Sequence, residues 1–230
     1  MISPEWLTAI ATIVLALVAF FTIFRDVLLQ LIRKPKFLIN FNSGQPDCHR
    51  VLLQQFGPQG QVLHAAETHY VRARVHNNGE TGAHDVEVSV VEVRKKDAAG
   101  NFQRVPMGTP WNLVWAHIGS HVLPHLPVGS ERHIDLGHVV DPQGRPGFAG
   151  EDKPGSDPLK TLFCLAFFVK SNTLEYLLDP GEEYQIDFQI FASNASPSPV
   201  FTFHLNHTGK WFFAESPMYS SGLGLRIEEA

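Results

Sequence analysis

The first feature of the chain is a long apolar run near its start. Residues 6–24 are 19 consecutive positions without a charge. At about 1.5 Å per helical residue they cover roughly 28 Å, close to the thickness of the hydrocarbon core of a bilayer. Pro4 suits the first turn of a helix, and we expect Pro35 to end the helix after about Ile32. The pattern therefore predicts one transmembrane helix within residues 1–36.

The charges around this run predict its orientation. Only Glu5 precedes the run, and the basic residues of this part of the chain all follow it, beside Asp26. Cytoplasmic flanks of membrane helices are enriched in Lys and Arg, so we expect a short N-terminus outside and the rest of the chain in the cytoplasm. A cleaved signal peptide is disfavoured because it needs a basic region before the apolar run. The basic residues expected to contact lipid headgroups are Arg25, Arg33, Lys34 and Lys36.

Small residues recur along one side of the predicted helix. Thr8, Thr12, Ala16 and Ala19 are spaced by four, four and three residues. Such a stripe lets a second helix approach closely, which makes homo-oligomerisation through this helix one hypothesis. Small residues are also common in membrane helices for no such reason, so a helix without a partner is the alternative.

After the predicted helix the pattern changes to short β-branched and aromatic runs separated by turn residues, which predicts an all-β domain over residues 37–230. Tyr70–His76 and Asp85–Arg94 alternate apolar and polar side chains, as strands with one dry face do. At 90–91 the alternation slips by one residue, which predicts a β-bulge. Further strands are expected at 37–41, 50–55, 102–105, 113–117, 132–136, 161–170, 183–192 and 199–206.

Two segments resemble a known group of modules. The segment 71–90 reads VRARVHNNGETGAHDVEVSV, and the segment 177–194 reads LLDPGEEYQIDFQIFASN. The first resembles the repeated strand pair of immunoglobulin-like bacterial adhesion modules, and the second is similar to the turn that starts a strand in the same group. The resemblance implies an immunoglobulin-like two-sheet β-sandwich. It also implies a module that binds other molecules or acts as a spacer, and it transfers no catalytic residue.

One segment of the predicted sandwich is unlike a strand. Residues 141–158 hold eight Gly or Pro residues and six charges, a composition that predicts a long loop with no packed element. Loops of this length are usually either functional or disordered, and the sequence leaves both open.

Six basic residues are the candidates for a ligand or partner site: Arg72, Arg74, Arg94, Lys95, Lys96 and Arg104. If they converge, they form a basic patch suited to anionic lipid headgroups, a nucleotide-like signal or an acidic partner. The alternative, which we favour, is that they pair with Glu87 and Glu92 across neighbouring strands.

Motifs for nucleophilic catalysis and phosphate binding are missing from the sequence. There is no G-x-S-x-G elbow and no G-x-x-x-x-G-K-[ST] loop, and the glycines of 222–226 are expected to belong to a tail. Cys48 and Cys164 are expected to be free thiols, since the cytoplasm is reducing. We therefore expect a protein that is not an enzyme and needs no cofactor.

The histidines at 117, 121 and 125 offer the best spacing for a metal site. A spacing of four residues aligns ligands only on a helix, and Gly119 and Pro124 interrupt this segment. Since no Cys-rich or H-E-x-x-H motif accompanies them, we expect no metal site.

Charge and composition narrow the function. The chain has 18 basic and 23 acidic residues, of which 14 basic and 21 acidic lie in 37–230, so nucleic-acid binding is not expected. The expected function is a single-pass, membrane-anchored, non-enzymatic module that interacts, senses or scaffolds at the inner membrane face, with the bilayer and a protein as partners. The alternative is a ligand-gated membrane effector that binds a small anionic signal and oligomerises through its helix.

Overall fold

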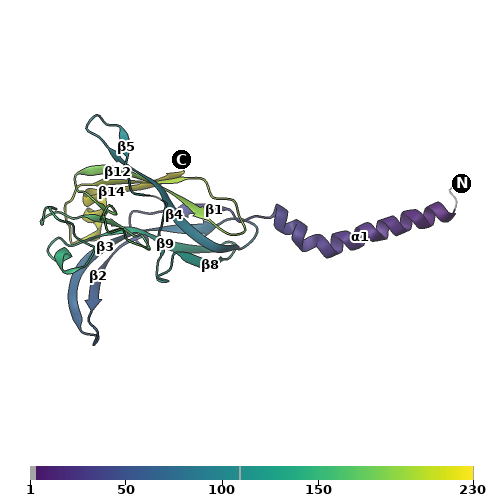
Figure 1. The fold of residues 1–230 in the computed structure, drawn as a ribbon, viewed down its shortest axis with the longest axis horizontal. Helices are drawn as coiled ribbons and strands as arrows, with labels where there is room; N and C mark the ends of the chain where they lie inside the picture. The colour runs from purple at the N-terminus through teal and green to yellow at the C-terminus, as the bar shows by residue number, and fades with distance from the viewer. Residues whose placement is uncertain (1–3, 109, 230) are drawn as a thin grey trace.

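The computed structural model describes residues 4–108 and 110–229, without the side chains of residues 5 and 26–32. Helix α1 (Pro4–Ile32) extends away from the rest of the chain at one end of the molecule (Figure 1). Its stretch Trp6–Arg25 has a mean hydropathy of 2.6 and contains no buried residue, so the helix is long and apolar enough to cross a membrane. The helix ends before Pro35, as predicted.

The remainder of the chain forms two antiparallel β-sheets, which confirms the predicted all-β, two-sheet sandwich. The first sheet contains β1 (Phe37–Asn40), β2 (Cys48–Phe56), β3 (Val62–Asn77), β7 (Val114–Trp115), β9 (Glu131–Val140), β10 (Phe163–Leu165) and β11 (Leu177–Leu178). The second contains β4 (Ala83–Lys96), β5 (Phe102–Arg104), β6 (Trp111–Asn112), β8 (Val122–Leu126), β12 (Glu182–Phe191), β13 (Phe201–His207) and β14 (Leu223–Glu229). Short helical turns occupy Arg145–Gly147, α2 (Glu215–Pro217) and Met218–Gly222.

The core lies between the two sheets and is rich in aromatic side chains. Trp115, Phe163, Phe188 and Phe203 are all buried in one apolar cluster drawn from both sheets. The indole Nε1 of Trp115 on β7 donates to the carbonyl oxygen of Val86 on β4, 3.0 Å away. A buried indole N–H needs such an acceptor, and here the acceptor belongs to the opposite sheet.

Strands β3 and β4 do not form the strand pair suggested by the resemblance. β3 pairs with β1, β2 and β9, whereas β4 pairs with β5, β6, β8 and β12 in the other sheet. Residues 78–82 carry the chain from one sheet to the other. Alternation identifies the dry face of each strand, and two dry faces can meet across the core as well as side by side in one sheet.

The predicted bulge is confirmed, and the expected C-terminal tail is not. In the pairing of β4 with β12, Asp187 lies opposite Glu92 and Phe188 opposite Val90, which leaves Val91 as the extra residue. The expected tail is wrong, because 223–229 forms strand β14 at the edge of the second sheet. Its apolar residues alternate as Leu223, Leu225 and Ile227, and all three contact the core.

The loop 141–158 is also more structured than its composition predicts. Arg145 lies in a short 3₁₀ turn, and its guanidinium is buried, where it donates hydrogen bonds to Ser156 Oγ and the carbonyl oxygen of Asp157. Phe148 packs with Val140, Ala66 and Leu53 in a second, smaller apolar cluster. The expectation of no packed element is therefore wrong, because the buried Arg145 guanidinium donates to Ser156 and Asp157 of the loop and Phe148 packs in an apolar cluster.

Candidate functional site

Two neighbouring strands place a thiol beside an imidazole in the interior of the sandwich. Cys164 on β10 lies directly opposite His138 on β9 in the antiparallel ladder. Residues opposite each other in such a ladder project their side chains on the same face, about 5 Å apart at Cβ. Both side chains are buried. The pairing of β9 with β10 therefore places the His138 imidazole beside the Cys164 thiol inside the sandwich.

The third member of the group, Glu151, comes from the loop 141–158. Its backbone N–H donates to the carbonyl oxygen of Phe148, which itself is anchored in the smaller apolar cluster. Next along the chain, Asp152 forms an ion pair with the buried guanidinium of Arg145, with Nε 3.1 Å from Oδ1. The folded loop thus holds the Glu151 carboxylate against the strand pair.

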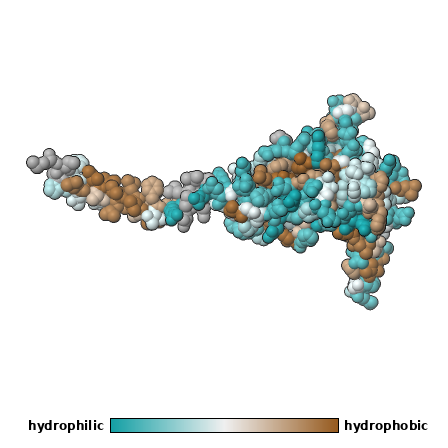
Figure 2. Space-filling view, turned by 180° about the vertical axis from the view of Figure 1, so that it is seen from behind, coloured by the Kyte–Doolittle hydropathy of each residue, from teal (hydrophilic) through white to brown (hydrophobic). Residues whose placement is uncertain are grey.

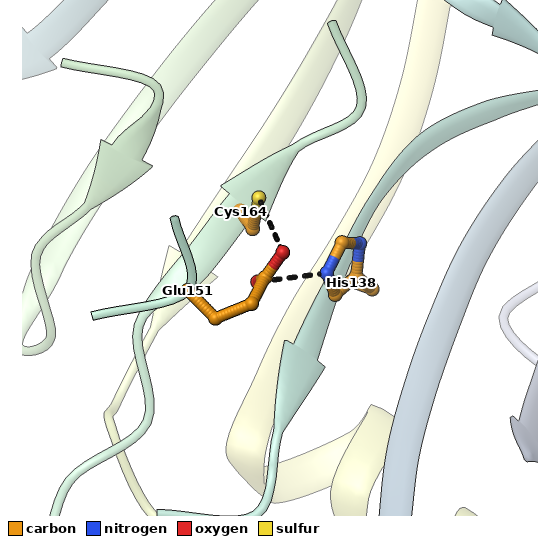
Figure 3. A group of neighbouring side chains, drawn as sticks. All are labelled: His138, Glu151 and Cys164. Carbon is orange, nitrogen blue, oxygen red and sulfur yellow. Dashed lines mark hydrogen bonds and ion pairs between the residues drawn. The ribbon is translucent and has the colours of Figure 1, made fainter. Parts of the chain in front are cut away.

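The carboxylate of Glu151 lies between the other side chains of the group (Figure 3). Its Oε2 is 2.9 Å from Nε2 of His138, and its Oε1 is 2.8 Å from Nζ of Lys170 and 3.8 Å from Sγ of Cys164. The other ring nitrogen of His138, Nδ1, is buried and has no hydrogen-bond partner among the described residues. We call His138, Glu151 and Cys164 the buried cluster, and Lys170 is its partly exposed neighbour.

Burial and charge act in opposite directions on the buried cluster. Burial raises the pKa of Glu151, but His138 and then Lys170 outweigh it, so this pKa falls to about 2. Burial lowers the pKa of His138, and the neighbouring Cys164 and Glu151 reverse that effect, so the pKa of His138 lies well above its usual value. The carboxylate is therefore ionised across the physiological pH range.

Chemically, the buried cluster brings together three kinds of metal ligand. One ligand atom each from His138, Glu151 and Cys164 lies within 4.8 Å of the other two, and all three residues are buried. Cys164 is only 1% exposed, so a large external substrate could not reach its sulfur, and the thiol is badly placed to act as a nucleophile. The arrangement suits a small ion better than an external substrate.

The six predicted basic residues do not form a single patch. Arg72 and Arg74 lie on β3 in the first sheet, whereas the other four lie on β4 and β5 in the second. Each basic group has a carboxylate within 4.0 Å, as the pairing interpretation predicts. The ion pairs are Arg72–Asp135, Arg74–Asp47, Arg94–Asp187, Lys95–Glu182, Lys96–Glu183 and Arg104–Glu92.

The partners of these residues differ in part from those predicted. Glu92 does contact Arg94 and Arg104, but Glu87 accepts a hydrogen bond from the side chain of Asn112 instead. Arg72 pairs with Asp135 on β9 and Arg74 with Asp47 in the turn before β2, because β3 and β4 do not pair.

The three histidines considered for a metal site face different neighbours. His117 Nε2 lies 3.4 Å from Nη1 of Arg72, the ring of His121 contacts Phe168, and the ring of His125 stacks on His84. Both cysteines are buried and free.

The helical stripe lies on an exposed helix surface. The hydroxyl groups of Thr8 and Thr12 donate to the carbonyl oxygens of Pro4 and Thr8, four residues earlier, at 3.0 and 2.9 Å. Hydroxyl groups satisfied in this way present mainly their methyl groups to a neighbouring surface. Ala16 and Ala19 are exposed as well, so the stripe is accessible to another helix.

The residues that follow helix α1 form a stalk, residues 33–36, that is bound to the sandwich. The backbone N–H of Asn78 donates to the carbonyl oxygen of Lys36 at 2.8 Å, and that of Glu80 donates to Lys34 at 3.3 Å. Arg33 forms an exposed ion pair with Glu80, with Nε 3.4 Å from Oε2. Arg25, Lys34 and Lys36 are exposed. These contacts hold the segment between helix α1 and strand β1 against the sandwich.

The hairpin of β2 and β3 forms a second candidate site, which the sequence pattern did not single out. Its outer part, residues 51–66, projects from the body of the sandwich, and we call it the arm (Figure 1). The space-filling view shows apolar residues along it (Figure 2). Leu52, Phe56, Val62 and Leu63 are each between 48% and 58% exposed.

The sequence did not reveal the buried cluster, because its members do not form a recognisable motif. Glu151 lies 13 residues after His138, and Cys164 lies 13 residues after Glu151, a spacing that matches no ligand motif. The one available signal was a histidine next to the apolar pair Val139 and Val140, which places a polar ring in a buried strand.

Comparison with known proteins assigns no family to the chain. No family model and no curated protein matches it. A crystal structure described as Northeast Structural Genomics Consortium target SoR45 is similar over 78% of this chain and 92% of that one, at 11% sequence identity and a TM-score of 0.31. A similarity at this level carries no argument about function.

Proposed function

We propose that the chain is a single-pass membrane protein whose immunoglobulin-like sandwich binds a protein partner at the cytoplasmic face of the membrane, without catalysing a reaction. The observation that carries this proposal is the arm, an exposed apolar ribbon that contains no charged residue.

The arm has one irregularity in register, between Gln55 and Phe56, but it carries no charges that would keep its exposed strands from pairing with other chains. Proteins protect such edges with charges, bulges or covering elements. Residues 51–66 contain no Asp, Glu, Lys or Arg. Within the described part of the chain β2 pairs with β3 alone, and β9 pairs with β3 only from Thr68 onward. The β2 edge of the arm is therefore open to a strand supplied by another protein, whereas the loop 141–158 lies against His64 and Ala66 of β3.

One side of the arm is supported by the sandwich, which favours a role in binding. Leu53 and Ala66 are a cross-strand pair and pack with Phe148 of the loop 141–158. Leu52 and Phe56 alternate with Leu53 along β2, so they point to the opposite side. A two-stranded ribbon on its own is only marginally stable. Packing of one side against the sandwich therefore stabilises the arm and leaves its other side free to bind a partner.

Helix α1 and the stalk support a location of the sandwich at the membrane surface. Trp6–Arg25 has the length and hydropathy of a spanning segment, and the stalk is hydrogen-bonded to residues 78 and 80 of the sandwich. Because the stalk is held against the sandwich by these hydrogen bonds, the sandwich would lie close to the lipid headgroups. The basic residues after the span favour the cytoplasmic side.

Membrane insertion and orientation are tested together. We expect the full chain to stay in the membrane fraction after alkaline carbonate washing. A cysteine introduced as Ala98→Cys, at the exposed turn between β4 and β5, should react with a membrane-impermeant maleimide only after the cells are permeabilised. Release of the chain by carbonate, or labelling of intact cells, would contradict the anchor or the orientation respectively.

The arm is tested by site-specific photo-crosslinking in native membranes. A photoreactive residue at Phe56 should give a discrete protein adduct, and the same residue at Ala98 should not. Leu52→Ser and Leu63→Ser should abolish the Phe56 adduct while thermal unfolding of the sandwich is unchanged. An adduct of twice the mass of the chain would identify a second copy as the partner. Lipid adducts alone, or no adduct, would contradict a protein partner.

A further inference from the structure

We propose that His138, Glu151 and Cys164 form a binding site for one divalent transition metal ion of borderline softness, with Zn²⁺ as the ion that fits best. The site joins β9, β10 and the loop 141–158. It is separate from the arm and does not depend on the proposed partner binding.

The positions of the three ligands are close to those of a bound site. Usual zinc bond lengths and a tetrahedral arrangement put neighbouring ligand atoms about 3.4 to 3.6 Å apart. In the structure, Nε2 of His138 is 2.9 Å from Oε2 of Glu151, and Sγ of Cys164 is 3.8 Å from Oε1. These two distances involve different oxygens of Glu151. With one atom taken from each residue, the three ligand atoms lie within 4.8 Å of one another, so side-chain rotation, mainly of Glu151, would bring them onto one ion.

The backbone already positions two of the three ligands, so side-chain rotations are enough to complete the site. His138 and Cys164 are opposite each other in a ladder at the centre of the first sheet, and β9 is held on its other side by β3. Two ligands are thus placed before an ion arrives. Only Glu151, on the loop, needs to close onto them, and its loop is already folded around the buried Arg145.

The kinds of ligand select the metal. A thiolate and an imidazole favour Zn²⁺ or a similar ion over Mg²⁺ and Ca²⁺, which prefer oxygen ligands. The thiolate and the carboxylate together supply two negative charges, which match the charge of the cation in a buried site. Three protein ligands leave one coordination position for a further ligand, as in zinc sites that are not closed.

Lys170 is compatible with this role as an outer partner. Its Nζ is 2.8 Å from Oε1 of Glu151, which leaves Oε2 directed at His138. Carboxylates that bind metals are commonly oriented by a hydrogen bond to their second oxygen. The Lys170 side chain is 35% exposed, so its charge is partly solvated and opposes the cation less than a buried ammonium group would.

A bound ion would tie the loop to the sheet and stabilise the fold. Binding to the folded state alone raises the unfolding temperature in proportion to the logarithm of the free metal concentration. Because Phe148 of the same loop packs against the base of the arm, metal binding would also restrain the arm.

Cobalt titration of the full chain in detergent tests the site. We expect one equivalent of Co²⁺ to bind and to produce a thiolate-to-cobalt charge-transfer band, and Zn²⁺ to displace it. Cys164→Ser should remove the band and the bound equivalent, and Glu151→Gln should weaken binding by at least about tenfold, as expected for loss of a carboxylate ligand. Cys48→Ser is the matched control, since Cys48 is also buried and free, and it should keep the band.

Folding and metal binding are separated by a second measurement. Each variant is first required to show the far-ultraviolet circular dichroism of the unaltered chain. Zn²⁺ should then raise the unfolding temperature of the unaltered chain and of Cys48→Ser, but not of Cys164→Ser. The proposal is overturned if the folded, unaltered chain binds less than one equivalent of either ion, or if Cys164→Ser retains binding.

Discussion

The guanidinium of Arg74 makes two hydrogen bonds to the carboxylate of Asp47, with Nε 2.9 Å from Oδ1 and Nη2 3.2 Å from Oδ2. Asp47 is fully buried, and it also accepts a hydrogen bond from the backbone N–H of Asn42 at 2.8 Å. His133 Nε2 lies 3.2 Å from the same carboxylate. Arg74, a candidate for ligand binding on sequence grounds, is thus part of the contact that fastens the turn before β2 to β3.

Asp47→Asn should destabilise the sandwich. The substitution removes a charge-assisted pair from a buried carboxylate, but Arg74 is 23% exposed and keeps Glu131 at 3.3 Å, so we expect a cost of about 1.5 to 3 kcal/mol. Chemical denaturation followed by tryptophan fluorescence would measure the loss. Glu80→Gln removes one partner of the exposed Arg33–Glu80 pair and should cost about 0.5 kcal/mol or less. Equal effects of the two substitutions would show that burial of Asp47 has no energetic importance.

Trp115→Phe should also lower stability, through a different contact. The ring volume is partly kept, but the carbonyl oxygen of Val86 in the opposite sheet loses its donor, at a cost of about 1 to 3 kcal/mol. Trp6→Phe, on the exposed surface of α1, should leave the unfolding temperature of the sandwich unchanged. If Trp115→Phe is neutral in calorimetry, the hydrogen bond between the sheets contributes nothing.

Gly79→Ala should detach the stalk from the sandwich. A Cβ at this position would lie 2.4 Å from both the carbonyl oxygen of Lys34 and the backbone nitrogen of Lys36, and backbone atoms cannot move away easily. Hydrogen exchange should therefore accelerate at the amides of Asn78 and Glu80, which donate to the stalk.

Gly44→Ala is the matched control for the stalk, because a Cβ there meets only Asn42 Oδ1 at 3.9 Å, an ordinary contact. It should leave exchange at residues 78 and 80 unchanged. Normal protection of these two amides in Gly79→Ala would mean that the stalk is not held by the contacts described.

His207 should make the fold less stable in mild acid. Burial lowers its pKa to about 4, against weaker opposing effects of Asp179. The unfolded chain therefore takes up this proton first, so stability is greatest above pH 6.5 and falls by about 3 kcal/mol as the pH approaches 4. The neutral ring is held between the Thr161 hydroxyl, at 2.8 Å, and the carbonyl oxygen of Asp179, at 3.2 Å.

The pH effect of His207 is isolated by comparison with His207→Gln. Other groups that titrate in the same range contribute to both proteins and cancel in the difference. The stability gap between the two proteins should be largest near pH 7 and shrink toward pH 4 in urea unfolding experiments. A gap that does not change with pH would contradict the lowered pKa.

The sequence predicted local features better than strand partners. The Val90–Val91 slip in alternation identified the bulge, because side-chain direction in a strand is set by neighbouring residues. The same alternation could not show that β3 and β4 belong to different sheets. It also undervalued the strand 223–229, whose short apolar pattern becomes significant only beside β13.

The candidate sites were visible in the sequence to different degrees. The basic residues were chosen for their charge, and each has a carboxylate partner on a neighbouring strand or, for Arg74, in the turn before β2. The buried cluster joins His138, Glu151 and Cys164 through one strand pairing and one folded loop. The resulting spacing of 13 and 13 residues matches no known ligand motif.

The sequence by itself determined the apolar N-terminal helix, its end before Pro35 and the β-rich character of the rest, since each follows from the polarity of residues close together in the chain. Only the tertiary structure decided which strands pair, that the loop 141–158 folds around Arg145, and that the uncharged arm stands clear of the body. These depend on contacts between residues far apart in the chain, whose energies are settled by packing and by the satisfaction of buried polar groups.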